Sequence, residues 1–452
     1  MRITVIGCGY LGAVHAAAMA RLGHEVVGID IDAEKIASLS SGRVPFFEPG
    51  LPELLAEELA GGRLDFTTSM VAADVHFLAV GTPQTPSGAA NVGYLLAAVE
   101  RLLPVLRPGD LVVGKSTVPV GTAARLAARI ESTGASLAWN PEFLREGRAI
   151  VDTLEPDRIV YGVADGDTRS VELLDEVYAA LLEAGISRSV TDFATAELVK
   201  VASNAFLATK ISFINAMAEI AEVSGADITD LADILGQDPR IGRRFLNAGL
   251  GFGGGCLPKD LRGFIARAEE LGVGDALGFL REVDGVNLRR RERVVELVRR
   301  EAGGTDGELE GVRVAILGLA FKPDSDDVRD SPALDVAANL LFDDAIVSAT
   351  DPHALETARA AFPELHYHPS VSDTVRDADI VLVLTEWAEY TRLDPAAIAD
   401  VVRSRTIVDA RNCLDTERWV AAGWRVISLG RPTRGPARVS RRSADGERRL
   451  AG

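Results

Sequence analysis

Short runs of apolar residues alternate along this chain with amphipathic stretches and with turns rich in glycine and proline. The first run lies at residues 3–6, and others follow at 26–29, 75–80, 111–116 and 137–140. Uninterrupted apolar runs of this length predict strands that are buried on both faces. Because helical stretches separate the runs, the pattern predicts a doubly wound, mostly parallel sheet, whose ligands bind at the carboxyl ends of its strands.

The pattern changes near Ala194. Neither proline nor glycine interrupts the next thirty residues, and apolar residues recur at spacings of mostly three and four, which is typical of a long helix. A helix of this length between two α/β regions suits a domain connector and a dimerisation surface. Lys200 and Asn204 are four residues apart and therefore share one face of the helix. Taken alone, such a pair is more common on a solvated face.

The strand–loop–helix pattern resumes at 312–317, continues at 345–352 and 378–387, and ends with a last predicted strand at 405–412. We therefore expect an α/β protein with two doubly wound, Rossmann-like domains joined by a long central helix. The expected division is 1–193 for the first α/β domain, 194–300 for a helical dimerisation domain with the cysteine loop, 311–430 for the second α/β domain, and 431–452 for a disordered tail rich in arginine.

Composition limits the classes of function. The chain has 452 residues, of which 47% are hydrophobic, and a net charge of −18, which argues against binding to nucleic acid or to an anionic membrane. No apolar run is long enough to span a membrane, and the chain starts directly with a strand, so we expect a cytoplasmic protein. The three cysteines, Cys8, Cys256 and Cys413, lie far apart without metal-ligand spacing, so we expect neither a metal site nor a disulfide.

The first turn has the form GxGxxG, with Gly7, Gly9 and Gly12 between a strand and a helix, and Asp30 ends the next strand. The glycines allow the backbone to approach a pyrophosphate at the helix N-terminus, and the carboxylate accepts ribose hydroxyls. Because Asp30 would repel a 2′-phosphate, the turn predicts NAD rather than NADP. Lys35 is near enough in sequence to reach the same ribose, although a solvated helix lysine explains it equally well.

The second α/β region begins with the turn GLAFKP, which lacks the GxGxxG pattern and need not bind a dinucleotide. Its loops are cationic, since they carry Lys322, Arg329 and Arg411, and this favours the capture of a phosphate. The two regions together predict a site with NAD on one side and a phosphorylated substrate on the other.

Cys256 lies in the stretch GFGGGCLPKD, residues 251–260. A cysteine thiolate in such a site has a specific use, because it adds to an aldehyde and gives a tetrahedral adduct that can lose a second hydride. Either Lys259 or Lys200 would favour the thiolate or hold an oxyanion. A small buried thiol is the alternative reading for Cys256, and it is the one we adopt for Cys8 and Cys413.

Several longer motifs occur along the chain, in the order FFEPGL, KSTVPVGT, NPEFLREG, LVKVASNAFLATKISFIN, GFGGGCLPKD and GLAFKPDSDDVRDSPA, within a match that runs from Met1 to about Gly430. Together they resemble the UDP-glucose 6-dehydrogenase family within the nucleotide-sugar dehydrogenases. The resemblance implies an NAD-dependent, four-electron oxidation of UDP-glucose to UDP-glucuronate. It also implies a homodimer built on the central helices, or a larger assembly.

The resemblance implies roles for individual residues. Cys256 would be the nucleophile, Lys200 and Asn204 would bind the sugar and stabilise oxyanions, Asp260 with Thr117 would orient or activate water, and Glu142 would be the base for thioester hydrolysis. The implied cofactor-binding residues are Gly7, Gly9, Tyr10, Leu11, Gly12, Asp30, Lys35, Thr82, Thr117, Glu146 and Arg329. The implied substrate-binding residues are Glu142, Phe143, Leu144, Lys200, Asn204, Arg240 (toward a neighbouring subunit), Phe252, Gly253, Cys256, Lys322 and Arg411.

Two positions depart from the family pattern. Gly255 stands where the family more often has serine, from which we expect retained chemistry and a less firmly held thiol, and Gly249 replaces a residue that is often polar. The alternatives left open are the same reaction on another nucleotide sugar, above all GDP-mannose, and a homologue that binds a sugar nucleotide without catalysis. Lys259 argues against 2-acetamido sugars, and a two-electron hydroxyacid dehydrogenase would not need Cys256.

Overall fold

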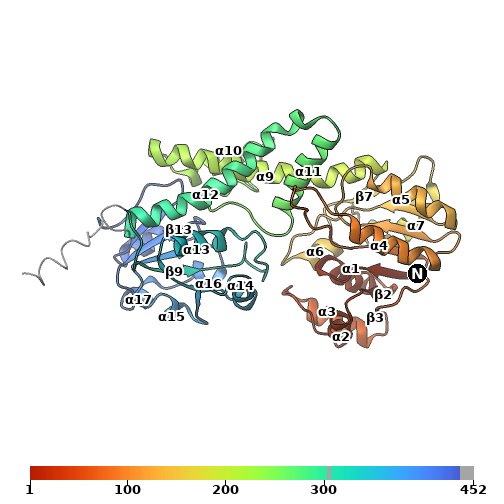
Figure 1. Ribbon diagram of the computed structural model, residues 1–452, viewed down its shortest axis with the longest axis horizontal. Helices are drawn as coiled ribbons and strands as arrows, with labels where there is room; N and C mark the ends of the chain where they lie inside the picture. Colours follow the sequence, from red (N-terminus) through yellow and green to blue (C-terminus); the bar gives the residue numbers. More distant parts are fainter. Residues whose placement is uncertain (303–306, 438–452) are drawn as a thin grey trace, which may run out of the picture. The chain divides into compact units, whose positions relative to one another are not determined.

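The computed structural model describes residues 1–302 and 307–437, which divide into two compact units (Figure 1). Unit 1 consists of Met1–Ala205 and Lys259–Gly278. Unit 2 consists of Phe206–Pro258 and the chain from Phe279 on. Each unit contains one sheet with its own hydrophobic core.

The described residues of unit 1 form an eight-stranded sheet in the order β3-β2-β1-β4-β5-β6-β7-β8. Neighbouring strands are parallel except for β6 and β7, which pair antiparallel. The strands are β1 (Arg2–Ile6), β2 (Glu25–Ile29), β3 (Leu64–Thr67), β4 (Val75–Leu78), β5 (Leu111–Gly114), β6 (Ser136–Trp139), β7 (Ile159–Gly162) and β8 (Arg188–Thr191). The doubly wound sheet predicted from the apolar runs is confirmed.

Helices cover both faces of this sheet, as β5 shows. Leu111 and Val113 pack into one core cluster, and Val112 between them packs into another on the opposite face, because successive strand residues point to opposite sides. This is why the strand reads as a continuous apolar run. The helices of this part are α1 (Tyr10–Arg21), α2 (Ala33–Ser40), α3 (Leu51–Ala60), α4 (Gly93–Leu102), α5 (Thr122–Ile130), α6 (Ala149–Leu154), α7 (Thr168–Val177) and α8 (Ala179–Glu183).

The long helix predicted from Ala194 is α9 (Phe193–Ser224), with 32 residues. Its first part, up to Ala205, belongs to unit 1, and the rest belongs to unit 2. Helix α11 (Leu257–Glu270) begins directly after Cys256, and from Lys259 on it belongs to unit 1. Both helices therefore contribute residues to each unit.

The described residues of unit 2 form a six-stranded parallel sheet in the order β11-β10-β9-β12-β13-β14. The strands are β9 (Arg313–Leu317), β10 (Ile346–Thr350), β11 (His366–Tyr367), β12 (Ile380–Val383), β13 (Thr406–Asp409) and β14 (Arg425–Ser428). The helices are α10 (Ile228–Gly236), α12 (Gly278–Ala302), α13 (Pro332–Phe342), α14 (Leu355–Ala361), α15 (Val371–Thr374), α16 (Ala388–Thr391), α17 (Pro395–Ala399) and α18 (Thr416–Ala421).

The expectation that the strand at 405–412 is the last one is wrong, because β14 follows it and pairs with β13. The predicted disordered tail is only partly described. Arg431 forms an ion pair with Asp227, and Arg434 bridges to Val426 of β14, so the start of this segment is packed. Residues 438–452 lie outside the described residues. Within the described ranges, no helix combines the length and the apolarity that crossing a membrane requires.

Candidate active site

The glycine turn between β1 and α1 is shaped by close backbone contacts in unit 1. Gly7 has a φ of +94°, and a Cβ on Gly12 would lie 1.8 Å from the carbonyl oxygen of Gly7. Only glycine therefore allows α1 to begin so close to the end of β1. A Cβ on Gly9 would meet no atom within 4 Å, so the turn is open on that side. The turn fits the predicted approach of a pyrophosphate to the helix N-terminus.

Asp30 follows directly after β2 and is 9% exposed. Its Oδ2 accepts hydrogen bonds from the backbone N–H of Cys8 (2.9 Å) and from Nζ of Lys35 (3.0 Å). The carboxylate thus lies beside the glycine turn, which is the arrangement that ribose recognition in a dinucleotide fold requires. Burial and the charge of Asp30 raise the pKa of Cys8 to about 12. This thiol remains protonated, which agrees with its structural reading.

Glu48 ties the first helix to the loop that carries Glu146. The hydroxyl of Tyr10 donates to Glu48, and the same carboxylate accepts the backbone N–H groups of Gly147 (2.7 Å) and Ala149 (2.8 Å). Glu48 is 3% exposed, so these bonds are shielded from water. They fix the loop before α6 against the start of α1.

Glu142 and Lys200 form a nearly buried ion pair. Nζ of Lys200 lies 2.8 Å from Oε1 of Glu142, and the side chains are 6% and 11% exposed respectively. The backbone N–H of Leu144 donates to Oε2 of Glu142 at 2.7 Å. Burial raises the pKa of Glu142, but Lys200 and the Leu144 N–H outweigh it, so that the pKa lies below its ordinary value. Glu142 is therefore held as a carboxylate.

Asn204 lies one turn after Lys200 on α9 and contacts a second carboxylate. Its Nδ2 donates to Oδ2 of Asp260 on α11 at 2.7 Å, and Nζ of Lys259 donates to Oδ1 of Asp260 at 2.5 Å. Lys200, Asn204 and Asp260 are all buried. The lysine–asparagine face predicted from the spacing is thus a buried polar face, and its two residues bind different carboxylates.

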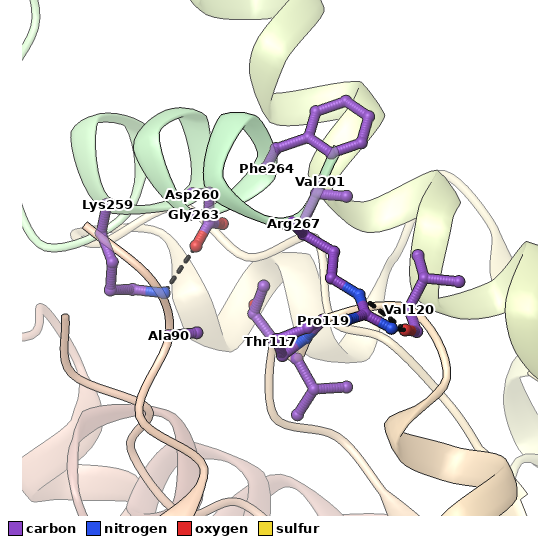
Figure 2. A pocket seen from close by; sticks show the side chains of 11 residues that line it. Ala90, Thr117, Pro119, Val120, Val201, Lys259, Asp260, Gly263, Phe264 and Arg267 are labelled. Carbon is purple, nitrogen blue, oxygen red and sulfur yellow. Dashed lines mark hydrogen bonds and ion pairs between the residues drawn. The ribbon is translucent and has the colours of Figure 1, made fainter. Parts of the chain in front are cut away.

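A pocket lies between the loop after β5 and the first turns of α11 (Figure 2). Thr117 and Asp260, the two residues expected to orient water, both line it. Figure 2 also shows the Lys259–Asp260 pair and the guanidinium of Arg267 donating to the carbonyl of Val120. The lining residues are Ala90, Thr117, Val118, Pro119, Val120, Val201, Lys259, Asp260, Gly263, Phe264 and Arg267.

Thr82 and Phe143 support this cluster from neighbouring loops. Oγ1 of Thr82 donates to the carbonyl of Thr117 at 2.7 Å. The ring of Phe143 lies 5.7 Å from Nζ of Lys200 and 3.9 Å from the guanidinium carbon of Arg158, both measured to the ring centroid. Unit 1 therefore brings together Thr82, Thr117, Glu142, Phe143, Lys200, Asn204 and Asp260 among the predicted residues.

The cysteine loop of unit 2 is held by contacts along its backbone. Gly251 has a φ of +98°, and a Cβ there would lie 2.3 Å from Oδ1 of Asn287 on α12. The N–H of Phe252 donates to Oδ1 of Asn287 at 2.7 Å, and its carbonyl accepts from Nδ2 of Asn287 at 2.9 Å. Cys256 follows this loop, and its side chain is exposed.

The remaining glycines of the loop face the segment after β9. A Cβ on Gly253 would lie 2.3 Å from the carbonyl oxygen of Asp330, and one on Gly254 would lie 2.7 Å from the ring of Phe321. A Cβ on Gly255 would lie 2.4 Å from the guanidinium carbon of Arg329. Gly255 thus provides the space that the Arg329 guanidinium fills.

The other predicted residues of unit 2 differ in their surroundings. Arg411 donates to three backbone carbonyls, those of Leu384, Gly251 and Phe321, at 2.7, 2.9 and 3.2 Å. It therefore braces the cysteine loop. Arg240 has an 88% exposed side chain and pairs with Asp238 two residues away.

Lys322 and Gly249 are two further predicted positions in unit 2. Nζ of Lys322 lies 5.7 Å from the ring centroid of Phe321. A Cβ on Gly249 would lie 2.8 Å from the carbonyl oxygen of Ala410. Gly249, which replaces a residue that is often polar, therefore lies close to the backbone after β13.

One buried residue near the site was not predicted. Lys115, directly after β5, donates to Oδ1 of Asn140 at 2.8 Å and is 7% exposed. The signal in the sequence was a lysine at the carboxyl end of an otherwise apolar run, in a position where a charge is costly.

Comparison with known proteins identifies the family. Three family models match in order: the NAD-binding domain (residues 1–182), the central domain (194–289) and the UDP-binding domain (315–416) of the UDP-glucose/GDP-mannose dehydrogenase family. The chain belongs to this family. It is therefore a nucleotide-sugar dehydrogenase, and its matched NAD-binding domain identifies NAD as the cofactor.

Relatives match over nearly the whole chain. The UDP-glucose 6-dehydrogenase YwqF of Bacillus subtilis is 42% identical over 95% of this chain and 98% of its own. The UDP-glucose 6-dehydrogenase of Rhizobium meliloti is 40% identical over 96% of this chain and all of its own length. Among solved structures, a UDP-glucose dehydrogenase from Pyrobaculum islandicum is 39% identical, with a TM-score of 0.86 over 95% of this chain and 98% of its own.

Proposed function

We propose that this dehydrogenase oxidises UDP-glucose to UDP-glucuronate in two NAD-dependent steps through a thioester on Cys256. Relatives that are about 40% identical over almost the full length are UDP-glucose 6-dehydrogenases, and the third matched domain is a UDP-binding domain. The relatives favour UDP-glucose, and the UDP-binding domain favours a UDP-sugar over GDP-mannose.

The hydrogen bonds of Lys200 and Asn204 are the observation that best supports this two-step oxidation. Lys200 and Asn204 lie one turn apart on α9, and each is hydrogen-bonded to a different buried carboxylate, Glu142 or Asp260. Two donors and two acceptors side by side can stabilise an oxyanion and move protons in successive steps. A dehydrogenase that performs one simple hydride transfer has no need for this doubled arrangement.

The first oxidation converts the C6 alcohol to an aldehyde, as a hydride leaves C6 and a proton leaves the hydroxyl. NAD, when bound, supplies the hydride acceptor for this step and for the later one. Asp260, held by Asn204 and Lys259, is positioned to receive the proton through a water in the pocket that Thr117 lines.

The second oxidation needs Cys256. Its thiolate forms a C–S bond with the aldehyde carbon, and the carbonyl oxygen becomes an oxyanion that Lys200 and Asn204 stabilise by donating hydrogen bonds. This thiohemiacetal then loses a hydride from C6 as its oxyanion returns to a carbonyl. The product is a thioester, still attached to Cys256.

Hydrolysis releases the acid. Water attacks the thioester carbon, Glu142 accepts a proton from the water, and the C–S bond breaks with the electron pair leaving on sulfur. One sugar, one water and two NAD⁺ thus yield one carboxylate, two NADH and three protons. The low pKa of Glu142 means that it is unprotonated and ready to accept this proton at neutral pH.

We further propose that the chain acts as a homodimer through α9. Phe206, Phe213 and Ile220 repeat every seven residues on the part of α9 within unit 2, and their side chains are 66%, 49% and 57% exposed. Apolar residues at this spacing lie on one side of a helix and form a seam for a second helix. Because the thiol must stay reduced, we place the enzyme in the cytoplasm.

Replacement of the nucleophile tests the proposed mechanism. Cys256→Ala is expected to abolish formation of UDP-glucuronate while NAD binding, followed by fluorescence, is retained, because the glycine turn lies in unit 1 and the cysteine in unit 2. Acid formation by this variant would rule out the thioester. Turnover of GDP-mannose but not of UDP-glucose by the unchanged protein would support the alternative substrate, and binding without turnover of either would support a non-catalytic homologue.

A further inference from the structure

Lys115 is buried and lies near enough to Glu142 and Lys200 for its charge to interact with theirs. It follows β5 directly, and its Nζ donates to Oδ1 of Asn140 at 2.8 Å and to the hydroxyl of Tyr178 at 3.4 Å. Asn140 directly follows β6, the strand next to β5, and its backbone N–H donates to the carbonyl of Gly114 at 2.8 Å. The lysine and the asparagine thus join the carboxyl ends of two neighbouring strands.

The cluster around this ammonium is satisfied by neutral groups. The hydroxyl of Tyr178 donates to Oδ1 of Asn140 at 2.6 Å, and Nδ2 of Asn140 donates to the carbonyl of Val160 at 2.9 Å. The rings of Phe77 and Tyr178 lie 5.8 and 5.9 Å from Nζ of Lys115. Across the part of the chain that the structure describes, the hydrogen-bond partners of Nζ of Lys115 are Asn140 and Tyr178, and neither is a carboxylate. A buried cation without a direct counterion is costly and is usually kept for a function.

The charge of Lys115 interacts with the charges of Glu142 and Lys200. Burial is the main cause that lowers the pKa of Lys115 to about 8, while Glu142 opposes this shift and Lys200 adds to it. In return, Lys115 contributes to the lowered pKa of Glu142, after the larger effects of Lys200 and of the Leu144 N–H. Two cations therefore act on Glu142: Lys200 contacts it directly, and Lys115 acts from its place beside Asn140.

We propose that Lys115 is a positioning residue for the hydrolysis step, in which its ammonium anchors Asn140, two residues before Glu142, and keeps the Glu142 carboxylate ionised when Lys200 turns to the substrate. The inference rests on the function proposed above. Lys200 has two tasks there, pairing with Glu142 and stabilising the substrate oxyanion. A second cation that never leaves its place keeps the base ready while the first one is engaged.

Other titratable groups near Lys115 do not supply this charge. Burial and the charge of Lys115 lower the pKa of His15 on α1, so that this imidazole is neutral. Burial raises the pKa of Tyr178, which follows α7, so it remains a phenol. Glu142 and Lys200 are thus the charges that Lys115 faces among the described residues.

The test separates charge from packing. Lys115→Met keeps the length of the side chain but removes its charge and its hydrogen bonds. Tyr178→Phe is the matched control, since it removes one hydroxyl from the same cluster and leaves all charges in place. For both variants and the wild type, we would follow NADH release with UDP-glucose under single-turnover conditions, the mass of the adduct on Cys256, and the pH dependence of thioester hydrolysis.

In Lys115→Met the thioester adduct should accumulate, hydrolysis near neutral pH should slow by about tenfold, and the acidic limb of its pH profile should move to higher pH, because a lost cation raises the pKa of the base. Tyr178→Phe should leave that limb in place. An unmoved limb in Lys115→Met, with only a changed melting temperature, would overturn the inference. If this variant does not fold, Lys115→Gln, which keeps a donor for Asn140 without the charge, gives the same comparison. A wild type that forms no thioester would refute the proposed function instead.

Discussion

Asn204 donates a 2.7 Å hydrogen bond from Nδ2 to Oδ2 of Asp260 and thereby connects α9 to α11 within unit 1. Both side chains are buried. The other oxygen of Asp260 accepts from Lys259. The carboxylate is therefore positioned by two donors from two directions, and it lines the same pocket as Thr117.

Asp260→Asn should both destabilise the protein and slow the reaction. The new amide would turn an NH₂ group toward either Asn204 or Lys259, so one of the two buried hydrogen bonds would be lost, at a cost of about 1–3 kcal/mol. We expect a lower melting temperature and a kcat reduced by at least about tenfold, since proton transfer through water would lose its acceptor. Asp275→Asn, at an exposed position of the same unit, is the control. Equal kcat values in both variants would contradict the role of Asp260.

The lowered pKa of Lys115 predicts that the stability of the protein depends on pH in an unusual way. Its pKa falls from 10.5 to about 8 in the folded protein, so between these values the unfolded chain binds more protons than the folded one. Stability therefore rises as the pH increases through this window. At neutral pH the shift corresponds to about 3 kcal/mol of destabilisation.

Lys115→Met should accordingly be more stable than the wild type at neutral pH, and its advantage should shrink as the pH rises above about 8. Chemical denaturation at several pH values measures this difference directly. Lys210→Met, on α9, serves as the control for the loss of a lysine. An advantage that does not change between about pH 8 and 10.5 would show that folding does not lower the pKa of Lys115.

The glycines of the cysteine loop should differ in their tolerance of a methyl group. Gly254→Ala would place a Cβ 2.7 Å from the ring of Phe321 at a φ of +84°, so we expect a loss of at least about 1 kcal/mol of stability. For Gly255→Ala, the three atoms nearest to the new Cβ all belong to the guanidinium of Arg329, which pairs with Asp327 on a side chain that is 65% exposed and can shift.

For Gly255→Ala we therefore expect stability within about 0.5 kcal/mol of the wild type, together with a KM for NAD raised several-fold, because the displaced Arg329 is a predicted cofactor residue. Gly255→Ser should behave in the same way. Denaturation and steady-state kinetics on the two alanine variants make the comparison. Unchanged NAD kinetics in Gly255→Ala would contradict the assignment of Arg329.

A single charged substitution on α9 tests the proposed dimer. Phe213→Glu would place a carboxylate in the apolar seam of α9 and should shift the protein to monomers in analytical ultracentrifugation. Phe342→Glu, at the end of α13, is a matched control, because Phe342 is 87% exposed and lies outside the seam. A Phe213→Glu variant with the sedimentation of the wild type would contradict the proposed interface.

The sequence predicted those elements whose signal is local. Continuous apolar runs located several strands that are buried on two faces, such as β5 and β12, although β7, which is also buried, was missed. The uninterrupted helical spacing located α9. Strand β8 carried no such signal, because its residues lie at the sheet edge and are mostly exposed. The strand β14 was missed because its apolar run is short and follows a segment that reads as helix.

The candidate site was predictable in its residue types but not in its pairings. Spacing placed Lys200 and Asn204 on one face, but only the fold shows that Glu142 pairs with the first and Asp260 with the second. These partners are 58 and 56 residues away in sequence. Lys115 was not recognised because its meaning depends on burial and on Asn140, which belongs to another strand end.

The most direct test of the account is the number of NADH molecules formed for each UDP-glucose consumed by the purified wild type with excess NAD. We expect two NADH for each UDP-glucose, because the aldehyde is retained on Cys256 and oxidised again before release. Formation of one NADH per sugar, with release of a free aldehyde, would contradict it.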